Sequence, residues 1–397
     1  MKATRPRVIE LTEYITQRLE RDMLAESDGL SLWRDYDRQI TVDYPSPLTD
    51  GQWQLTSQGW AGYIPLSDAV HLALRPKVAV GNLFRMLEYA YRLKIDFPDG
   101  LYECRSLEEC YESIAVMLAK RVLERARKGF YRAGVSRAER LPYVRGRLDV
   151  GPLMRAPWHA NPPCRYEERT TDIEENRILA WTLSLIARSG LCTERSRATV
   201  RQAYHTLHGA VQLLPCPSSA CLNRVYTRLN EDYRPLHALC RFFLDNSGPR
   251  HERGEHLMLP FLVDMERLFE MFVAEWLRVH LPPHLTLQAQ APVHIDEHGH
   301  VSFQIDLVLH DAATGAAVAV LDTKYKNVGQ PASDDIAQVV AYAEAKGCLE
   351  ACLVYPTPLA RPLDARVGAI RVRSLVFDLS GDVERAGQTF RESLLCR

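Results

Sequence analysis

The sequence predicts an α+β N-terminal region followed by an α/β C-terminal domain in which a mixed sheet is flanked by helices. The chain has 397 residues, which is too long for one compact core and indicates several domains. Short alternating segments fill residues 40–80, helical periodicity follows, and a strand–turn–strand–helix pattern lies near the C-terminus. We therefore expect a small β-rich unit at residues 1–80, a mainly helical part at 81–250 and a C-terminal domain at 251–397.

The composition is that of an ordinary globular protein. Hydrophobic residues make up 46% of the chain and charged residues 25%, which excludes a disordered, collagen-like or coiled-coil protein. No charge-free stretch reaches the about 20 residues that a membrane span needs, and no apolar signal core follows the basic N-terminus. The ten cysteines include no Cys-x-x-Cys pair, which argues against a zinc or iron–sulfur site. We expect a cytoplasmic protein that has no membrane partner.

The first part of the chain is predicted to be a small antiparallel β unit. Residues 40–44, 53–56 and 70–74 alternate apolar and polar side chains, and Pro- and Gly-containing turns separate them. The period then changes to that of a helix, and Asn82 stands where the side chain of a helix N-cap is expected.

Two further helix starts are predicted in the middle of the chain. Ser106 and Thr171 are each followed three residues later by Glu, which is the spacing of a capping box. Helical segments continue to about residue 245, and the polar residues 246–255 are the best linker candidate.

Charge is distributed unevenly along the chain. Residues 251–397 hold 13 Lys and Arg against 20 Asp and Glu, whereas residues 1–250 hold 36 against 30. Ten of the basic residues, against two glutamates, lie within residues 120–147. This segment is either a solvated helix face with a loop or a surface that contacts DNA or an acidic partner, because clustered guanidinium groups bind phosphates. The residues expected to make such contacts are Arg121, Arg125, Arg127, Lys128 and Arg132.

The C-terminal domain carries an ordered set of polar residues. Residues 265–277 follow the apolar spacing of an amphipathic helix, and Glu270 lies at the edge of its apolar stripe. Asp306 lies on the polar face of the strand that follows. After a Thr-Gly turn, Asp322 and Lys324 lie on one side of a second strand. If the two strands pair as a hairpin, these side chains converge at the strand ends.

A further helix follows this hairpin. Ser333 is expected to cap it, and Gln338 and Tyr342 lie four residues apart on one of its faces, where they would support the site. The acidic and histidine-containing run at residues 294–300 is instead typical of a polar hairpin turn.

The order of these residues points to metal-assisted hydrolysis. Asp306 and Asp322 form an oxygen-ligand site that suits Mg²⁺, with Mn²⁺ as the alternative, and Glu270 completes the metal shell directly or through water. The metal polarises a phosphoryl oxygen and lowers the pKa of a bound water. Lys324 orients that water and stabilises negative charge in the transition state. Asp-x-Lys alone is a weak signal, because charged residues are common at the exposed end of a strand.

The ordered set resembles the PD-(D/E)xK nuclease superfamily. Ile305 stands where that superfamily usually has proline, which leaves the metal ligand Asp306 in place. More specifically, the chain is similar to the McrC family, the nuclease subunit of McrBC-type modification-dependent restriction systems. The segments that carry this resemblance are Arg75 to Ala90, Arg145 to Asp149, Thr170 to Leu179, Leu268 to Glu270 and Leu321 to Lys326.

The resemblance implies a Mg²⁺-dependent endonuclease that cleaves double-stranded DNA. It also implies that the N-terminal region docks onto a hexameric AAA+ GTPase of the McrB type and stimulates it. This chain itself is expected to bind no nucleotide, since it has no Gly-x-x-x-x-Gly-Lys-Ser/Thr loop. Two rival readings are a non-cleaving activator or adaptor of the GTPase, and a free-standing DNA-repair nuclease of the RecB-like kind. A neighbouring gene for an AAA+ GTPase would separate them.

Overall fold

The computed structural model describes residues 6–67, 69–93, 106–248, 251–253, 256–258, 260–294, 302–326 and 328–396. Its contacts divide the chain into two compact units. We call Met1–Cys110 with Asn246–Arg397 the sheet unit, and Tyr111–Asp245 the helical unit. These two units are not the three parts that were expected from the sequence. The three expected domain boundaries remain a prediction. None of the helices in the described part of the chain is long and apolar enough to cross a membrane.

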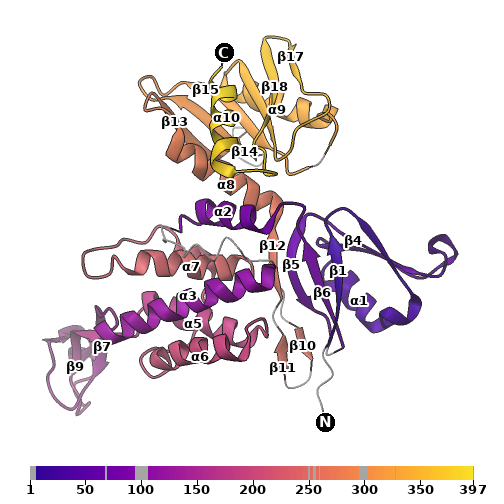
Figure 1. Cartoon of the computed structure of the whole chain (residues 1–397). Helices are drawn as coiled ribbons and strands as arrows, with labels where there is room; N and C mark the ends of the chain where they lie inside the picture. The colour runs from indigo at the N-terminus through magenta and orange to yellow at the C-terminus, as the bar shows by residue number, and fades with distance from the viewer. Residues whose placement is uncertain are drawn as a thin grey trace. The chain divides into compact units, whose positions relative to one another are not determined.

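The N-terminal part of the sheet unit contains two small sheets (Figure 1). One has the order β1-β6-β5-β12, in which β1 and β6 are parallel and the other neighbours are antiparallel. The other has the order β2-β4-β3. The elements are β1 (Arg7–Thr12), β2 (Thr16–Leu19), α1 (Glu26–Asp35), β3 (Ile40–Asp43), β4 (Trp53–Ser57), β5 (Trp60–Pro65), β6 (Val70–Arg75) and β12 (Phe261–Asp264). The three predicted strands are confirmed as β3, β4 and β6, but the prediction that they form one antiparallel unit was wrong, because β6 lies in the other sheet and runs parallel to β1. Helix α1 was not predicted.

Alternation along these strands builds the core that joins the two sheets. Leu11 on β1, Leu55 on β4 and Leu72 on β6 are fully buried, and Leu32 on α1 packs into the same cluster. The strand β12 belongs to the sheet of β1, β6 and β5, although it lies after the segment that was expected to be a linker. The linker candidate contains β10 (His251–Arg253), which pairs with β11 (His256–Met258) directly after it.

Helix α2 (Val80–Ala90) follows β6 and packs against α8 (Met265–His280). The prediction that Asn82 caps α2 was wrong, because the N-cap is Ala79 and makes no side-chain cap bond. The amide of Asn82 instead donates to the carbonyl oxygens of Leu379 and Gly381, at 2.9 and 2.8 Å. Asn82 therefore links α2 to the C-terminal part of the sheet unit.

That C-terminal part is a mixed sheet with helices on both faces, as expected (Figure 1). The strand order among the described residues is β13-β14-β15-β16-β18-β17; β15, β16 and β18 run parallel, and the other neighbours are antiparallel. The elements are β13 (Leu285–His294), β14 (Ser302–Asp311), β15 (Ala317–Thr323), α9 (Ser333–Lys346), β16 (Glu350–Tyr355), β17 (Asp364–Val367), β18 (Ile370–Val376) and α10 (Val383–Leu395). The predicted hairpin is confirmed, because β14 pairs with β15 across a turn in which Gly315 has a φ of 71°.

Both faces of this sheet are covered by apolar packing. Val339 of α9 lies in a buried cluster with Val308, Val320 and Leu353 of the sheet. The apolar stripe of α8 is buried as predicted, and its Phe272 contacts the ring of Phe377 at a centroid distance of 4.8 Å. Ser333 is the first residue of α9 rather than its cap, since the N-cap is Ala332.

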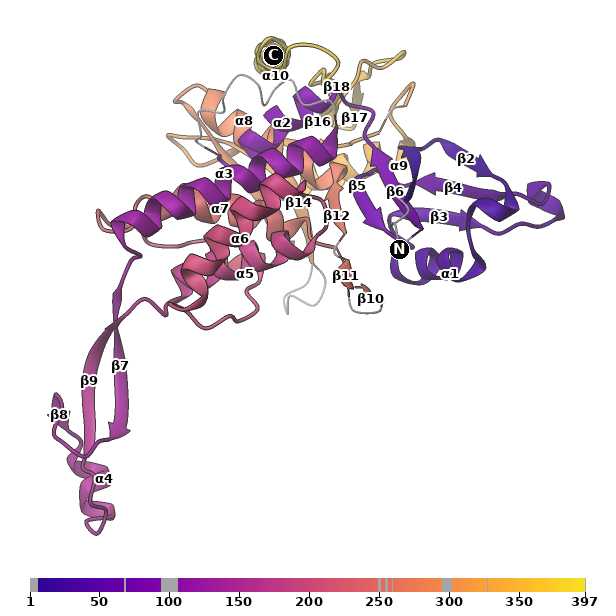
Figure 2. The same ribbon diagram turned by 60° about the horizontal axis from the view of Figure 1, so that its bottom comes forward.

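The helical unit consists of packed helices and a projecting arm (Figure 2). Its elements are α3 (Leu107–Lys128, whose first turn lies in the sheet unit), β7 (Ala133–Arg140), β8 (Arg147–Leu148), α4 (Val150–Arg155), β9 (Pro163–Thr170), α5 (Glu174–Arg188), α6 (Glu194–His208) and α7 (Tyr233–Asp245). The hydroxyl of Ser106 accepts from the Glu109 N–H, which confirms the predicted start of α3. Thr171 makes no cap, because it donates to the Ala210 carbonyl instead.

The expectation of a mainly helical middle part missed the arm. β7 and β9 pair antiparallel over their whole length, and β8 pairs with β9. α4 lies at the far end of the arm (Figure 2). Most side chains of β7 are exposed, so the strand has no continuous apolar face that would distinguish it from a loop in the sequence.

Candidate active site

The hairpin β14–β15 brings the two predicted aspartates to the same end of the sheet. Leu307 and Leu321 are the last paired residues at this end of the hairpin, and Asp306 and Asp322 occupy the next position on each strand. The backbone N–H and the hydroxyl of Thr323 both donate to Oδ2 of Asp306, each at 2.9 Å. These two hydrogen bonds fix the orientation of the Asp306 carboxylate.

Lys324 follows β15 directly and makes a close ion pair with Asp322. Its Nζ lies 2.7 Å from Oδ2 of Asp322, and Asp322 is only 2% exposed. Nζ also donates to Oε1 of Gln338 at 3.0 Å, and the Gln338 amide donates to the hydroxyl of Tyr342 at 2.6 Å. The two predicted supporting residues on α9 are therefore connected to Lys324 through one chain of hydrogen bonds.

A buried carboxylate that sequence reasoning missed also contacts this lysine. Asp335, on the first turn of α9, lies 3.6 Å from Nζ of Lys324 and 3.3 Å from Nζ of Lys326. Asp335 is 6% exposed, so its carboxylate is largely removed from water, and the two ammonium groups compensate for the lost hydration. An acidic residue in the first turn of a helix is common for dipole reasons alone, and nothing in the sequence distinguished this one.

Glu270 reaches the same region from α8. Its carboxylate accepts a hydrogen bond from the side-chain amide of Gln290 on β13. Burial raises the pKa of Glu270 to about 7, and the charges of Asp306 and Asp322 add to that rise. Gln290 was not predicted, and its φ of 50° is rare for a residue other than glycine. A backbone outlier of this kind is not visible in the sequence.

The electrostatics of the group are those of crowded carboxylates. Burial raises the pKa of Asp322 to about 6, and Asp306 raises it further against the opposing effect of Lys324. Burial disfavours the charge of Lys324, but its ion pair with Asp322 outweighs this and raises the pKa of the lysine. The ion pair therefore favours the charged lysine, whereas Glu270 and Asp322 have raised pKa values because burial and neighbouring carboxylates disfavour their charges.

The donor set fits a hard divalent cation in its chemistry. Every donor is a carboxylate oxygen, and the raised pKa values of Glu270 and Asp322 mark a place where added positive charge would be favourable. Among the residues the structure describes, however, no three His, Cys, Asp or Glu side chains are gathered closely enough to enclose a metal ion. Mg²⁺ commonly binds through one or two carboxylates together with water and substrate phosphates, so a closed cage is not required. The run at residues 295–300 lies outside the described residues.

The predicted basic contact residues have different surroundings. Arg125 is largely buried at 15% side-chain exposure, pairs with Asp232 at 3.0 Å and lies over the ring of Tyr233. Its role in the helical unit is therefore structural. Arg121 is half-buried on the same helix.

The other three predicted contact residues are exposed. Arg127 and Lys128 lie in the last turn of α3, and Arg132 lies just before β7. Within the described residues, no ion pair to any of these three is found. Their positive charges are therefore available to bind a phosphate group or an acidic surface.

The far end of the arm exposes large apolar side chains. Monomeric proteins seldom expose a contiguous group of this kind, which usually marks a protein contact. The members are Tyr143, Val144, Val150, Met154 and Trp158, with exposed fractions between 57% and 76%. We call this group the arm tip.

Comparison with known proteins places the chain in a family. A family profile described as "McrBC 5-methylcytosine restriction system component" matches residues 55–356, which is most of the chain. The chain belongs to this McrBC family. The "Type IV methyl-directed restriction enzyme EcoKMcrBC" of Escherichia coli (strain K12) is 24% identical over 215 residues. That match spans 52% of this chain and 61% of the length of the relative.

A solved structure extends the family likeness to the fold. It is titled "Refined half-complex from tetradecameric assembly of Thermococcus gammatolerans McrB AAA+ hexamers with bound McrC". The similarity covers 98% of this chain and 99% of that chain, at a TM-score of 0.57 and 19% sequence identity. The mixed α/β architecture of this McrBC family member therefore resembles a known fold along nearly its whole length.

Proposed function

We propose that this chain is the DNA endonuclease subunit of an McrBC-type modification-dependent restriction complex, and that its cleavage requires Mg²⁺. The observation that carries the proposal is the group formed by Asp306, Asp322 and Lys324 at the end of one hairpin, in a chain of the McrBC family. A domain of the PD-(D/E)xK kind is part of the same proposal, because the order of these residues along the chain resembles that superfamily.

Each residue has a distinct part in the proposed reaction. Bound Mg²⁺ would supply a Lewis acid for the phosphoryl oxygen and a water of lowered pKa. Asp306 and Asp322 would hold the ion, and Thr323 orients Asp306 for this by binding its Oδ2. The ammonium group of Lys324 stabilises the negative charge that develops on the phosphoryl group. Glu270 would complete the metal shell directly or through water. Mn²⁺, which prefers similar oxygen ligands, should replace Mg²⁺.

Double-stranded DNA is the proposed substrate. The exposed cations at the end of α3 can neutralise backbone phosphates, and such contacts make affinity fall as salt rises. In this proposal, recognition of the modification that marks the DNA is left to the partner.

A hexameric AAA+ GTPase of the McrB type is the proposed partner. A solved structure that resembles this fold is described as McrB AAA+ hexamers with bound McrC. The exposed arm tip supports a protein contact in this chain, because it would otherwise hold Trp158 and Met154 in water at 76% exposure each. We propose that this contact also stimulates GTP hydrolysis by the partner.

Plasmid cleavage by the assembled complex tests the proposal. Asp306→Ala, Asp322→Ala and Lys324→Ala should each abolish cleavage of 5-methylcytosine-containing plasmid in the presence of Mg²⁺ and GTP. The matched control is Asp334→Ala, which removes an exposed carboxylate on the first turn of α9. Full activity of the Asp322 variant would refute the site assignment.

The same assay separates the two rival functions. A non-cleaving activator would raise the GTPase rate of the partner, while the wild-type chain would leave the plasmid intact. A free-standing nuclease of the RecB-like kind, which the bond between Gln338 and Tyr342 beside Lys324 favours, would cut DNA fully without partner or GTP. The proposal requires that cleavage depend on both.

A further inference from the structure

We propose that Glu13 is a positioning residue for the reaction: its buried carboxylate holds Tyr325, and through Tyr325 it fixes where Lys324 lies. This inference rests on the proposed function, because the position of Lys324 affects a reaction only if the group that contains it cleaves DNA. Glu13 follows β1 and is 312 residues away from Tyr325 in the chain, yet both belong to the sheet unit.

The contacts of Glu13 are unusual for a structural carboxylate. The residue is 0% exposed, and its Oε2 accepts from the Lys77 backbone N–H at 3.0 Å and from the Tyr325 hydroxyl at 3.2 Å. Its Oε1 has no hydrogen-bond partner among the described residues. A buried carboxylate without a cation in close contact is costly, because it loses its hydration without a compensating charge. Costly groups of this kind are characteristic of functional positions.

The backbone next to Lys324 explains how Tyr325 can position it. The N–H of Lys326 donates to the carbonyl oxygen of Lys324 at 2.8 Å, which closes a three-residue turn centred on Tyr325. Lys324 and Lys326 therefore both reach Asp335, whereas the Tyr325 side chain reaches Glu13. Two opposing anchors, Asp335 and Glu13, thus restrain the turn that carries the ammonium group.

Tyr325 also connects this turn to the helix that carries Glu270. Its ring lies 5.9 Å from the ring of Phe269, the neighbour of Glu270 on α8. A change in the tilt of Tyr325 would therefore move the turn and α8 relative to each other. The positions of Lys324 and Glu270 therefore both depend on where the ring of Tyr325 lies.

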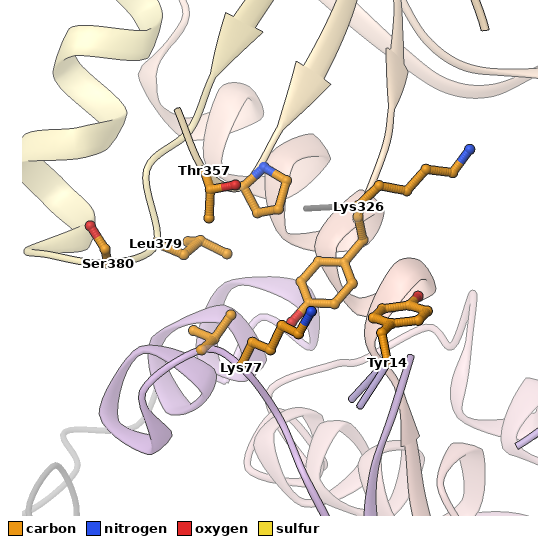
Figure 3. A pocket seen from close by; sticks show the side chains of 9 residues that line it. Tyr14, Lys77, Lys326, Thr357, Leu379 and Ser380 are labelled. Atoms are coloured by element: carbon orange, nitrogen blue, oxygen red, sulfur yellow. The ribbon is translucent and has the colours of Figure 1, made fainter. Parts of the chain in front are cut away.

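A small pocket borders the ring of Tyr325, which is otherwise buried at 5% exposure. The pocket has a volume of about 80 Å³ and is lined by Tyr14, Lys77 and Thr357 as well as by Tyr325 (Figure 3). Lys77 lies with its Nζ 5.1 Å from the centre of the Tyr14 ring, while Lys326 extends away from it. Since space is left beside Tyr325, the hydrogen bond to Glu13 adds to the restraint that packing gives.

Conservative variants test this role in the complex with its GTPase partner. Tyr325→Phe removes the hydroxyl but keeps the ring, and Glu13→Ala removes the acceptor. Each should lower kcat for plasmid cleavage about 10-fold to 100-fold, the loss that a displacement of about 1 Å causes, with KM for DNA changed less than about twofold. The double variant should be no slower than the single variants, because both remove the same hydrogen bond. Glu13→Gln should restore most of kcat, since its amide oxygen accepts the same two bonds.

The matched control is Tyr89→Phe. The Tyr89 hydroxyl donates to Glu384 at 2.7 Å, so it also bonds the N-terminal part of the sheet unit to the C-terminal part, but it lies on α2 away from Lys324. This variant should lose a similar amount of thermal stability and keep its kcat. Circular dichroism establishes that each variant is folded; if Glu13→Ala does not fold, Tyr325→Phe and Glu13→Gln decide.

Three results would overturn the inference. These are a wild-type kcat for Tyr325→Phe, an equal loss in Tyr89→Phe, or a Glu13→Gln variant that is as slow as Tyr325→Phe. If Asp322→Ala is inactive while Tyr325→Phe is fully active, the proposed function stands and only the positioning role fails. If Asp322→Ala cleaves normally, the proposed function itself fails.

Discussion

Replacing Glu270 with Gln should make the protein more stable and less active. Glu270 faces Asp306 and Asp322, and burial together with these charges raises its pKa from 4.5 to about 7. The difference corresponds to about 3.4 kcal/mol at 1.36 kcal/mol per pKa unit. Because Glu270 is only partly buried, we reduce this to a gain of about 1–2 kcal/mol in the free energy of unfolding at pH 8. Gln keeps the size of the side chain and removes the charge.

The sign of the pH dependence follows from the raised pKa. The folded protein binds a proton at Glu270 more tightly than the unfolded chain does, so stability falls as pH rises from about 4.5 to about 7. The gain from Glu270→Gln should therefore be complete at pH 8 and nearly absent at pH 4.5. Urea unfolding at both pH values, with EDTA present, measures it.

A neighbouring glutamate provides the control for this prediction. Glu266 lies one turn before Glu270 on α8 and is exposed, so Glu266→Gln should change stability by less than about 0.5 kcal/mol. Plasmid cleavage should fall sharply in Glu270→Gln and remain normal in Glu266→Gln. A Glu270→Gln variant that is less stable than wild type at pH 8, or equally stabilised at both pH values, would refute the electrostatic reasoning.

Three further predictions concern metal, DNA and partner binding. At pH 8, Mg²⁺ should raise the thermal midpoint of the wild-type protein but not that of Asp322→Asn, which differential scanning fluorimetry can measure. Charge reversal of Arg127, Lys128 and Arg132 to Glu should weaken DNA binding and make its salt dependence shallower; unchanged binding in a filter assay would favour a solvated face. Trp158→Ala in the arm tip should weaken binding to the GTPase partner about 10-fold or more, whereas its thermal midpoint should stay the same, because Trp158 is 76% exposed.

The sequence predicted the C-terminal elements well because burial imposes a period on them. α8 must place an apolar side chain on the sheet every three or four residues, and this pattern is readable without any knowledge of the sheet. Strand alternation likewise separates Asp306 from Ile305 and Leu307, which are fully buried. The positions of Asp306 and Asp322 beside the pair Leu307–Leu321 also depend on a register shift between Leu309 and His310, which the sequence did not indicate.

The contacts that complete the site were not predictable in this way. Thr323, Gln290 and Asp335 act on their partners only because strands and a helix from different parts of the chain meet. Asn82 shows the same limit, since its amide satisfies two carbonyl groups almost 300 residues away instead of its own helix end. Local capping rules assume that the nearest backbone group is the partner, and tertiary contacts replaced that partner here.

The direction of the pKa shifts distinguishes the carboxylates of the proposed active site from structural ion pairs in the same protein. Asp172 and Asp364 each bind an arginine through two hydrogen bonds, and these bonds lower their pKa values. At the end of the β14–β15 hairpin the opposite holds, because burial and neighbouring carboxylates raise the pKa of Glu270 and Asp322. A fold selected for stability alone would separate these carboxylates or pair each with an arginine. Carboxylates kept together at a cost to stability support the proposal that a divalent cation binds among them.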